Sequence, residues 1–183
     1  MFLVERELPV TIDIRSATMA DTLSFPEIER SSGESFRTLP DLAWIADDDV
    51  MSAEAHQRYL ATGIVLGAFD EERCVGFISA ERCDDGVFHV WQMAVALSYQ
   101  RQGIGAQLMR RLQELAGEQP LTLTTFREVV WNAPFYAALG FEVIAEEALS
   151  ARLREVLADE GAHGIPVERR VAMRWARQLS RDS

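Results

Sequence analysis

The apolar and polar positions in the first half of the chain predict a strand, two helices and an antiparallel group of strands. Residues 11–18 alternate apolar and polar side chains and include β-branched residues, as a strand does. Helical spacing predicts a helix within residues 19–36, and Ser52 is a suitable cap for a second helix that ends at Gly63. Three runs joined by short turns predict antiparallel strands at 64–70, 74–82 and 87–95, and the acidic, proline-containing stretch before Ser52 predicts a loop at 37–49.

The second half alternates between helical and strand patterns. Apolar residues from Ile104 to Leu115 recur at helical spacing, and Gly117 ends that helix. The remaining segments predict a strand at 121–126, a short helix at 131–140 and strands at 141–147 and 170–178. Residues 150–167 are predicted to be an insertion that is helical in its first half. Because the middle strands are joined by hairpins, the order predicts an α+β fold with a mixed, mostly antiparallel sheet.

Length and charge narrow the class of protein. The 183 residues predict one domain, 1–183, with a core at about 12–177. The net charge of −11 argues against a nucleic-acid binder, which needs a basic face, and fits either solubility or a cationic substrate. No window of eighteen apolar residues occurs, and three charged residues lie among the first seven, so we expect neither a membrane span nor a signal peptide. We therefore predict a cytoplasmic protein without membrane partners.

The residue types also exclude several kinds of chemistry. All 18 basic residues are arginines, which excludes a Schiff-base lysine and the lysine of a phosphate-binding P-loop. Cys74 and Cys83 have no histidine or cysteine at metal-ligand spacing, so we predict reduced thiols and no metal. Neither cysteine has a neighbour in sequence that would activate it, which disfavours a covalent acyl-cysteine route.

A polar turn with two glycines precedes the third predicted helix, in the stretch YQRQGIGAQLMRRL (99–112). The first N–H groups of a helix have no intrahelical partner, and together with the helix dipole they can bind an anion such as a pyrophosphate. A side chain at Gly103 or Gly105 would obstruct that approach. The alternative is that the glycines only permit a tight turn. A dinucleotide-binding fingerprint is excluded, because Leu108 stands where that pattern needs a third small residue.

The segment QRQGIGAQL resembles the QxxGxG/A signature of the GNAT superfamily of N-acetyltransferases, and NAPFYAALGF is similar to the superfamily's tyrosine-bearing helix. The resemblance implies a three-layer fold whose sheet is splayed between its fourth and fifth strands, with acetyl-CoA as cosubstrate. It implies that backbone groups of Met93, Ala94 and Val95 bind the pantetheine arm. The remaining implied cofactor-binding positions are Gln100, Arg101, Gln102, Gly103, Ile104, Gly105 and Ala106, with Asn132 as a further contact to the CoA arm.

Acetyl transfer needs a proton acceptor for the amine and a proton donor for the departing thiolate. The resemblance makes Tyr136 the donor, since a phenol is protonated at neutral pH. Strict strand alternation places His89, Trp91 and Met93 on one face, which makes His89 the candidate base. A structural histidine and a core tyrosine are the alternatives. HVWQMAV and APFYAALGF are also similar to arylalkylamine N-acetyltransferases, in which two histidines face the acceptor; here Trp91 replaces the second.

Acidic and aromatic residues on the expected acceptor side favour a cationic acceptor. We predict that Glu29, Glu34 and Trp91 contact a small primary amine of the polyamine or arylalkylamine type, which attacks the thioester directly. A protein or peptide amino group is the alternative acceptor, and a non-catalytic acyl-CoA-binding sensor is the alternative class. The predicted partners are this small molecule and no nucleic acid, with a monomer or homodimer both open.

Overall fold

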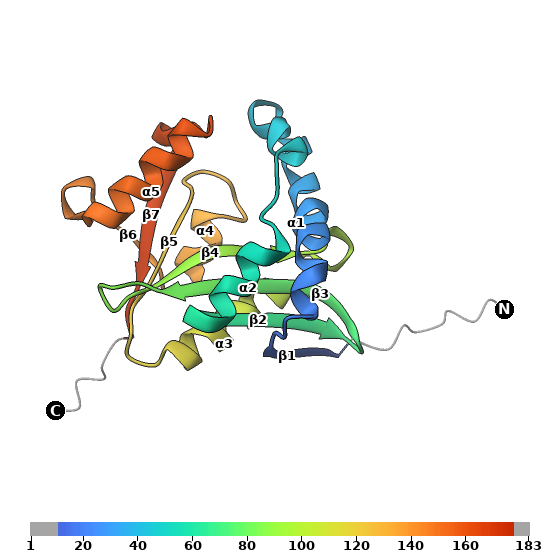
Figure 1. The fold of residues 1–183 in the computed structure, drawn as a ribbon. Helices are drawn as coiled ribbons and strands as arrows, with labels where there is room; N and C mark the ends of the chain where they lie inside the picture. The colour runs from blue at the N-terminus through green and yellow to red at the C-terminus, as the bar shows by residue number, and fades with distance from the viewer. Residues whose placement is uncertain (1–10, 178–183) are drawn as a thin grey trace.

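A computed structural model describes residues 11–177 and contains a seven-stranded sheet with helices on both faces (Figure 1). The strand order is β1-β2-β3-β4-β5-β7-β6. The strands are β1 Ile12–Ser16, β2 Gly63–Asp70, β3 Arg73–Arg82, β4 Phe88–Val95, β5 Leu121–Phe126, β6 Glu142–Val143 and β7 Arg170–Trp175. The α-helices are α1 Phe25–Gly33, α2 Ala53–Thr62, α3 Ile104–Ala116, α4 Ala133–Ala138 and α5 Ala151–Ala162.

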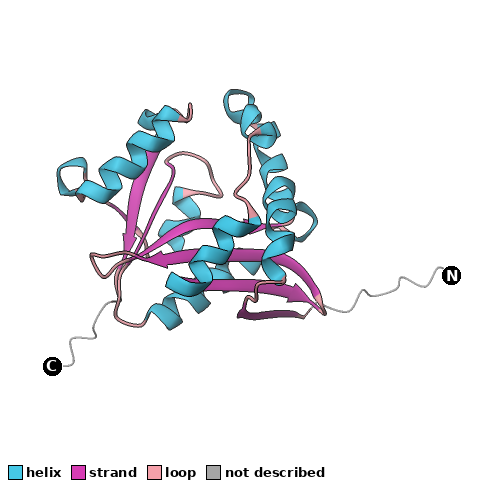
Figure 2. Ribbon diagram, viewed as in Figure 1, coloured by secondary structure: helices cyan, strands magenta, loops and turns pink. Residues whose placement is uncertain are grey.

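Strands β4 and β5 diverge soon after they meet. They are parallel, and within residues 11–177 they pair only at Phe88 with Leu121 and at His89 with Thr122. All other neighbouring strands are antiparallel. Figure 2 shows β5 and β7 fanning away from β4, with α1 beside one arm of the opening and α5 beside the other. This is the splayed, mixed sheet that the sequence predicts.

Each face of the sheet has its own apolar layer. The larger cluster joins the sheet to α3 through fully buried residues such as Leu108 and Leu112. On the opposite face, Phe25 of α1 stacks on Phe77 of β3 with their ring centroids 4.1 Å apart. A third cluster joins Leu42 to Phe126 and Val129. The sheet is therefore covered on both faces, as a three-layer α+β fold requires.

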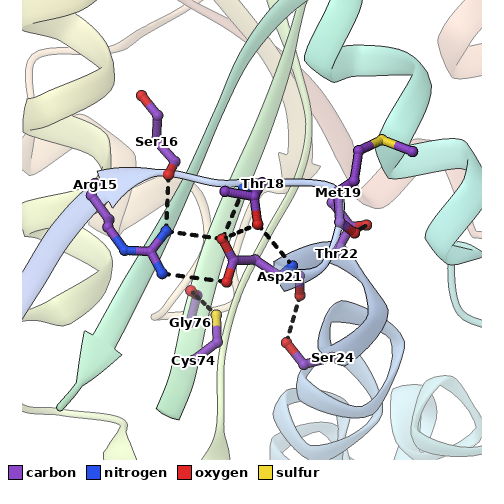
Figure 3. A network of polar contacts seen from close by, with 9 residues as sticks. All are labelled: Arg15, Ser16, Thr18, Met19, Asp21, Thr22, Ser24, Cys74 and Gly76. Carbon is purple, nitrogen blue, oxygen red and sulfur yellow. Dashed lines mark hydrogen bonds and ion pairs between the residues drawn. The ribbon is translucent and has the colours of Figure 1, made fainter. Parts of the chain in front are cut away.

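A polar network fixes the entry to the first helices (Figure 3). Asp21 accepts hydrogen bonds from the backbone N–H and hydroxyl of Thr18, both at 2.8 Å, and pairs with Arg15 at 2.9 Å. The hydrogen bond from Arg15 lowers the pKa of Asp21 below its ordinary 3.8. Arg15 also lies over the Phe69 ring, 3.6 Å from its centroid, so the network joins β1, β2 and the 3-10 turn at Asp21–Ser24 that precedes α1.

The predicted elements are confirmed in order, with differences in extent. The helix predicted within 19–36 is divided into a 3-10 turn at Asp21–Ser24, α1, and a second 3-10 turn at Glu34–Thr38. The predicted loop at 37–49 contains a 3-10 segment at Pro40–Asp47, and β6 is only two residues long. The insertion at 150–167 begins with α5, as expected, and Ser52 and Ser150 cap their helices through side-chain oxygens.

One prediction about β4 is wrong. Strict alternation was expected to place His89, Trp91 and Met93 on the same face, but the β3–β4 register shifts between Ser79 and Ala80. Ser79 pairs with Gln92 and Ala80 with Val90, which leaves Trp91 as the extra residue of a β-bulge. The bulge separates His89 from Met93, so the two side chains lie on opposite faces.

Three remaining predictions concern absences and extent. Between residues 11 and 177 no helix is long and apolar enough to cross a membrane, and no three histidine, cysteine or acidic residues gather as a metal site. Residues 1–10 and 178–183 of the predicted domain, including the end of the predicted last strand, lie outside the described residues. The single-domain boundary and the cytoplasmic location therefore stay predictions.

Candidate active site

The glycine turn leaves the start of α3 open to an anion. Gly103 adopts a left-handed conformation with φ of 80°, and no heavy atom of the described chain lies within 4 Å of the Cβ that an alanine would add there. Arg101 also has a positive φ, 59°. No side chain among the described residues caps the helix, and its first backbone bond runs from Gln107 N to Gly103 O. The N–H groups of the first turn are thus available to a phosphate.

Gln100 positions this turn. Its amide nitrogen donates to the backbone oxygen of Val95 at 3.0 Å and to Ser32 Oγ at 3.3 Å. Its amide oxygen accepts from the Ser35 hydroxyl at 2.8 Å. The side chain therefore connects the end of β4 with α1 and the segment after it, which is a role in shaping the loop.

Three other predicted cofactor residues, Met93, Val95 and Gly105, meet on the α3 face of the sheet. Met93 and Val95 pack against the main core cluster, whereas Ala94 points into the α1 layer. A Cβ on Gly105 would lie 3.5 Å from Phe135 Cζ and 3.8 Å from Met93 Cε. The end of β4, the start of α3 and α4 therefore converge at the opening between β4 and β5.

Tyr136 projects from α4 into the same region. Its ring makes edge contacts with Phe135 and Phe141, at centroid distances of 5.1 and 5.8 Å. Burial raises the pKa of Tyr136 to about 12, so its hydroxyl keeps its proton at neutral pH. Asn132 precedes α4, and its Oδ1 accepts from the Thr125 hydroxyl at 2.6 Å. This bond ties the start of α4 to β5, so Asn132 helps to orient Tyr136.

His89 is placed differently from the sequence-based expectation. It is 1% exposed, and its Nδ1 lies 2.9 Å from Thr122 Oγ1 on β5. Burial and, to a lesser extent, the charge of Arg152 lower the pKa of His89 to about 3. A buried imidazole with so low a pKa is a weak proton acceptor, and its hydrogen bond joins β4 to β5 at the point where they separate. These observations favour the structural alternative for His89.

Trp91 and Glu34, two predicted acceptor contacts, have partners within the chain. The Trp91 indole N–H donates to Glu81 Oε2 at 2.9 Å, and its ring lies parallel to that of Tyr59 on α2, 6.4 Å away. Glu34 pairs with Arg37 at 2.8 Å, and Arg37 also binds Asp47. That Glu34 carboxylate is 39% exposed and belongs to a surface ion-pair group.

Glu29 is the predicted acceptor residue that the fold brings to the splay. It lies on α1, and its carboxylate accepts hydrogen bonds from Gln92 Nε2 on β4 and from the Met51 backbone N–H at 3.2 Å. Its side chain is 15% exposed. Burial raises the pKa of Glu29 to about 7, despite the opposing effects of these hydrogen bonds and of Arg30. A carboxyl that titrates near neutral pH is suited to general-base catalysis.

The opposite arm of the splay carries polar residues that sequence analysis did not single out. Arg170 on β7 makes two hydrogen bonds to Glu160 on α5, at 2.8 and 2.9 Å. The Thr124 hydroxyl on β5 also donates to Glu160. Glu160 and Arg170 follow Thr124 by 36 and 46 residues, so the sequence has no local signal for this group.

An apolar cluster joins the two arms near the end of β5. Phe36, which follows α1, lies 5.8 Å from both Phe126 and Trp131 in ring-centroid distance. Fully buried Leu42 packs against Phe126 and Val129. These contacts connect the segment after α1 to the segment after β5, across the open side of the splay.

Comparisons with known proteins agree with this architecture. Residues 61–143 match a family model described as Acetyltransferase (GNAT) domain. The fold is similar to the PaiA N-acetyltransferase of Thermoplasma acidophilum in complex with coenzyme A, with a TM-score of 0.64, 17% identity, and coverage of 91% of this chain and 99% of that one.

Two further solved structures show the same fold at low sequence identity. The ribosomal-protein-alanine N-acetyltransferase of Escherichia coli has a TM-score of 0.64 and 15% identity, covering 94% of this chain and 98% of that one. The N-acetylglutamate synthase of Neisseria gonorrhoeae, complexed with coenzyme A and N-acetylglutamate, has a TM-score of 0.64 and 14% identity, covering 94% of this chain and 36% of that one. The family match over residues 61–143 and the fold of the described chain agree on the predicted class of enzyme, an N-acetyltransferase of the GNAT type.

Proposed function

We propose that this acetyltransferase transfers acetyl from acetyl-CoA to a small primary amine by direct attack, with Glu29 as the base and Tyr136 as the acid. The observation that carries the proposal is the position of Glu29: it is held against β4 beside the splay and titrates near neutral pH. Acetyl-CoA supplies the acetyl group as a thioester. An arylalkylamine-like preference, which the sequence motifs suggest, is part of this proposal.

The chain's own groups suit the donor. The open N-terminus of α3 and the left-handed Gly103 would bind the pyrophosphate through backbone N–H groups. Met93, Ala94 and Val95 end β4 where its pairing with β5 has already ceased, so their backbone groups on that side are suited to the pantetheine arm. Gln100 and Asn132 would act by shaping the turn and α4 rather than by touching the cofactor.

Two protonation states support the division of roles. Glu29, with a pKa of about 7, would take a proton from the acceptor ammonium, so that the neutral amine can attack the carbonyl carbon. Tyr136, with a pKa of about 12, would give its phenolic proton to the sulfur as the C–S bond breaks, and the phenolate would then recover a proton from the attacking nitrogen as the amide forms. Glu29 replaces His89 in this proposal because the His89 imidazole is buried and bonded to Thr122.

The surroundings of the splay favour a small, cationic acceptor. Glu29 on one arm and Glu160 on the other supply carboxylates, although Arg170 neutralises much of the second. The cluster of Phe36, Leu42 and Phe126 joins the arms and restricts the approach of an extended peptide. An amine with a short aliphatic or aromatic group fits this combination.

The test is thiol release from acetyl-CoA, measured against a panel of arylalkylamines, polyamines and peptide amino termini. We expect amine-dependent release with small amines. We also expect a loss of about a hundredfold in kcat for Tyr136→Phe and for Glu29→Gln, which is typical for removal of one acid or base. Both variants should retain thermal stabilisation by CoA.

The alternatives predict different outcomes. Release only with peptide amino termini would replace the small-amine acceptor with a protein substrate. Thermal stabilisation by CoA without thiol release in the presence of any amine would instead support a non-catalytic sensor module. A Tyr136→Phe variant with the wild-type rate of chemistry would remove Tyr136 from the mechanism.

A further inference from the structure

His56 is a completely buried histidine that the proposed reaction does not yet use. It lies on α2 with 0% exposure, and its ring is nearly perpendicular to the stacked rings of Phe25 and Phe77, at centroid distances of 5.2 and 4.8 Å. Its Nδ1 is 2.9 Å from the hydroxyl of Ser79, which is also completely buried. Its Nε2 is buried and has no hydrogen-bond partner in the described part of the chain.

The unpaired nitrogen lies beside the proposed base. Nε2 of His56 is 3.9 Å from Oε2 of Glu29, too long for a hydrogen bond and short enough for one after a side-chain shift of about 1 Å. An unsatisfied buried N–H costs about 1 to 3 kcal/mol, and the carboxylate is the acceptor within reach. Ser79, His56, Glu29 and Gln92 thus form a chain of polar groups that runs from β3 through α2 and α1 to β4.

We propose that His56 is a positioning residue for Glu29: its neutral imidazole, held by Ser79, donates from Nε2 to the Glu29 carboxylate, orients this base and stabilises its ionised form. The inference rests on the proposed function. In this arrangement the Ser79 hydroxyl, 2.9 Å from Nδ1, donates to that nitrogen, which leaves the imidazole proton on Nε2. Donation to the ionised form opposes the effect of burial on the Glu29 carboxyl.

The charges around the pair are compatible with this arrangement. Burial lowers the pKa of His56 to about 4, so the imidazole is neutral at physiological pH. Facing Glu29 are Arg30 from its own helix, the Met51 N–H, the Gln92 amide and His56. The imidazole itself faces two phenylalanine rings, Ser79 and Glu29, so its charged neighbour is the carboxylate.

The first experiment compares pH profiles of kcat/KM for the wild type, His56→Phe and His56→Gln. Phenylalanine keeps the ring packing and removes the donor, so we expect the midpoint to rise by about one pH unit, with activity at pH 7 about tenfold lower and recovery at alkaline pH. Glutamine can place an N–H near the same position, so we expect its midpoint close to the wild-type value. An unchanged midpoint in active His56→Phe would overturn the proposal, since a purely structural role lowers stability without moving the midpoint.

A second measurement does not depend on turnover or on folded variants. In the wild-type protein, nitrogen-15 NMR of the imidazoles should show His56 neutral from pH 5 to pH 8, with the proton on Nε2. The Nε2 resonance should shift as Glu29 titrates, and this shift should be missing in Glu29→Gln. A proton on Nδ1, or no response to Glu29, would overturn the inference. If Glu29→Gln did not affect catalysis, Glu29 would not be the base and the proposed function would fail in that respect. The NMR measurement would still test whether His56 donates to Glu29.

Discussion

Replacing Glu29 by glutamine should stabilise the folded chain at alkaline pH. The carboxyl is 15% exposed and has a pKa raised by burial from 4.5 to about 7. A raised folded-state value means that the folded chain binds the proton more tightly than the unfolded chain. Stability is therefore lost as pH increases from the unfolded value towards the folded value. Glutamine cannot ionise, so the variant avoids this loss.

The expected magnitude follows from the two pKa values of Glu29. Each unit of difference corresponds to about 1.4 kcal/mol, so the complete cost of ionising Glu29 is about 3 kcal/mol. Most of it, about 2.5 kcal/mol, should develop between pH 5 and pH 8. In Glu29→Gln the hydrogen bonds to Gln92 and Met51 rearrange, which would lower the free energy of unfolding of the variant by about 1 kcal/mol at every pH. This loss does not change how the difference between variant and wild type depends on pH.

Urea unfolding at pH 5, 6, 7 and 8 measures this difference directly. The free energy of unfolding of Glu29→Gln minus that of the wild type should increase across the series, and the low pKa values of His56 and His89 cancel because both proteins contain them. Glu27→Gln, which removes an exposed charge from the same helix, is the control. A difference between Glu29→Gln and wild type that stays flat from pH 5 to pH 8 would refute the reasoning, because it would mean that burial does not perturb this carboxyl.

Three further predictions concern the turn, the network in Figure 3 and the buried pair at the splay. Gly103→Ala should abolish thermal stabilisation by CoA. Gly117→Ala, also at a positive φ with open space but at the other end of α3, should retain it although its ψ of −114° makes an alanine more strained there than at Gly103; equal CoA responses would contradict the phosphate role. Asp21→Ala should lower the free energy of unfolding by about 1 to 2 kcal/mol at pH 7, and because its folded pKa lies below 3.8 the loss should shrink only at more acidic pH in urea titrations. Thr122→Val should destabilise the chain by about 1 to 3 kcal/mol by leaving His89 without its partner, with amine-dependent kcat/KM little changed; a large catalytic loss would restore His89 as a functional residue.

The sequence was sufficient for the order of elements because most of the signals are local. The apolar spacing from Ile104 to Leu112 fixes α3, Ser52 marks the start of α2, and the hairpin turns fix β2, β3 and β4 as neighbours. The glycine turn and the tyrosine helix were recognisable because each lies within one short stretch. The extent of β6 was harder to predict, since its pairing with β7 depends on tertiary contacts.

The candidate base was not predictable from local pattern. Glu29 stands on an amphipathic helix like any solvated glutamate. Its raised pKa results from burial, which depends on tertiary packing, and the groups that donate hydrogen bonds to it and oppose the rise, Gln92 and Met51, lie 63 and 22 residues away. His56 had no local signal either, because its partner Ser79 lies on β3, 23 residues further along the chain. Local sequence thus indicated the candidate donor side, whereas the candidate acceptor side of the proposed function depends on long-range packing.

The bulge at Trp91 explains which side chains of β4 face α3 and which face α1. Phe88, Val90 and Met93 all pack in the α3 layer, and the three-residue step between Val90 and Met93 reverses the alternation within one strand. In a regular strand Val90 would lie on the same face as Gln92 and Ala94, and Met93 would lie on the opposite face. Val90 and Met93 could then not both face α3. The extra residue therefore lets the C-terminal half of β4 present Met93 towards α3 and Gln92 towards Glu29, and it turns His89 away from Met93. In the proposed function, a single inserted position in β4 thus favours a carboxylate from α1, rather than the strand's own histidine, as the proton acceptor.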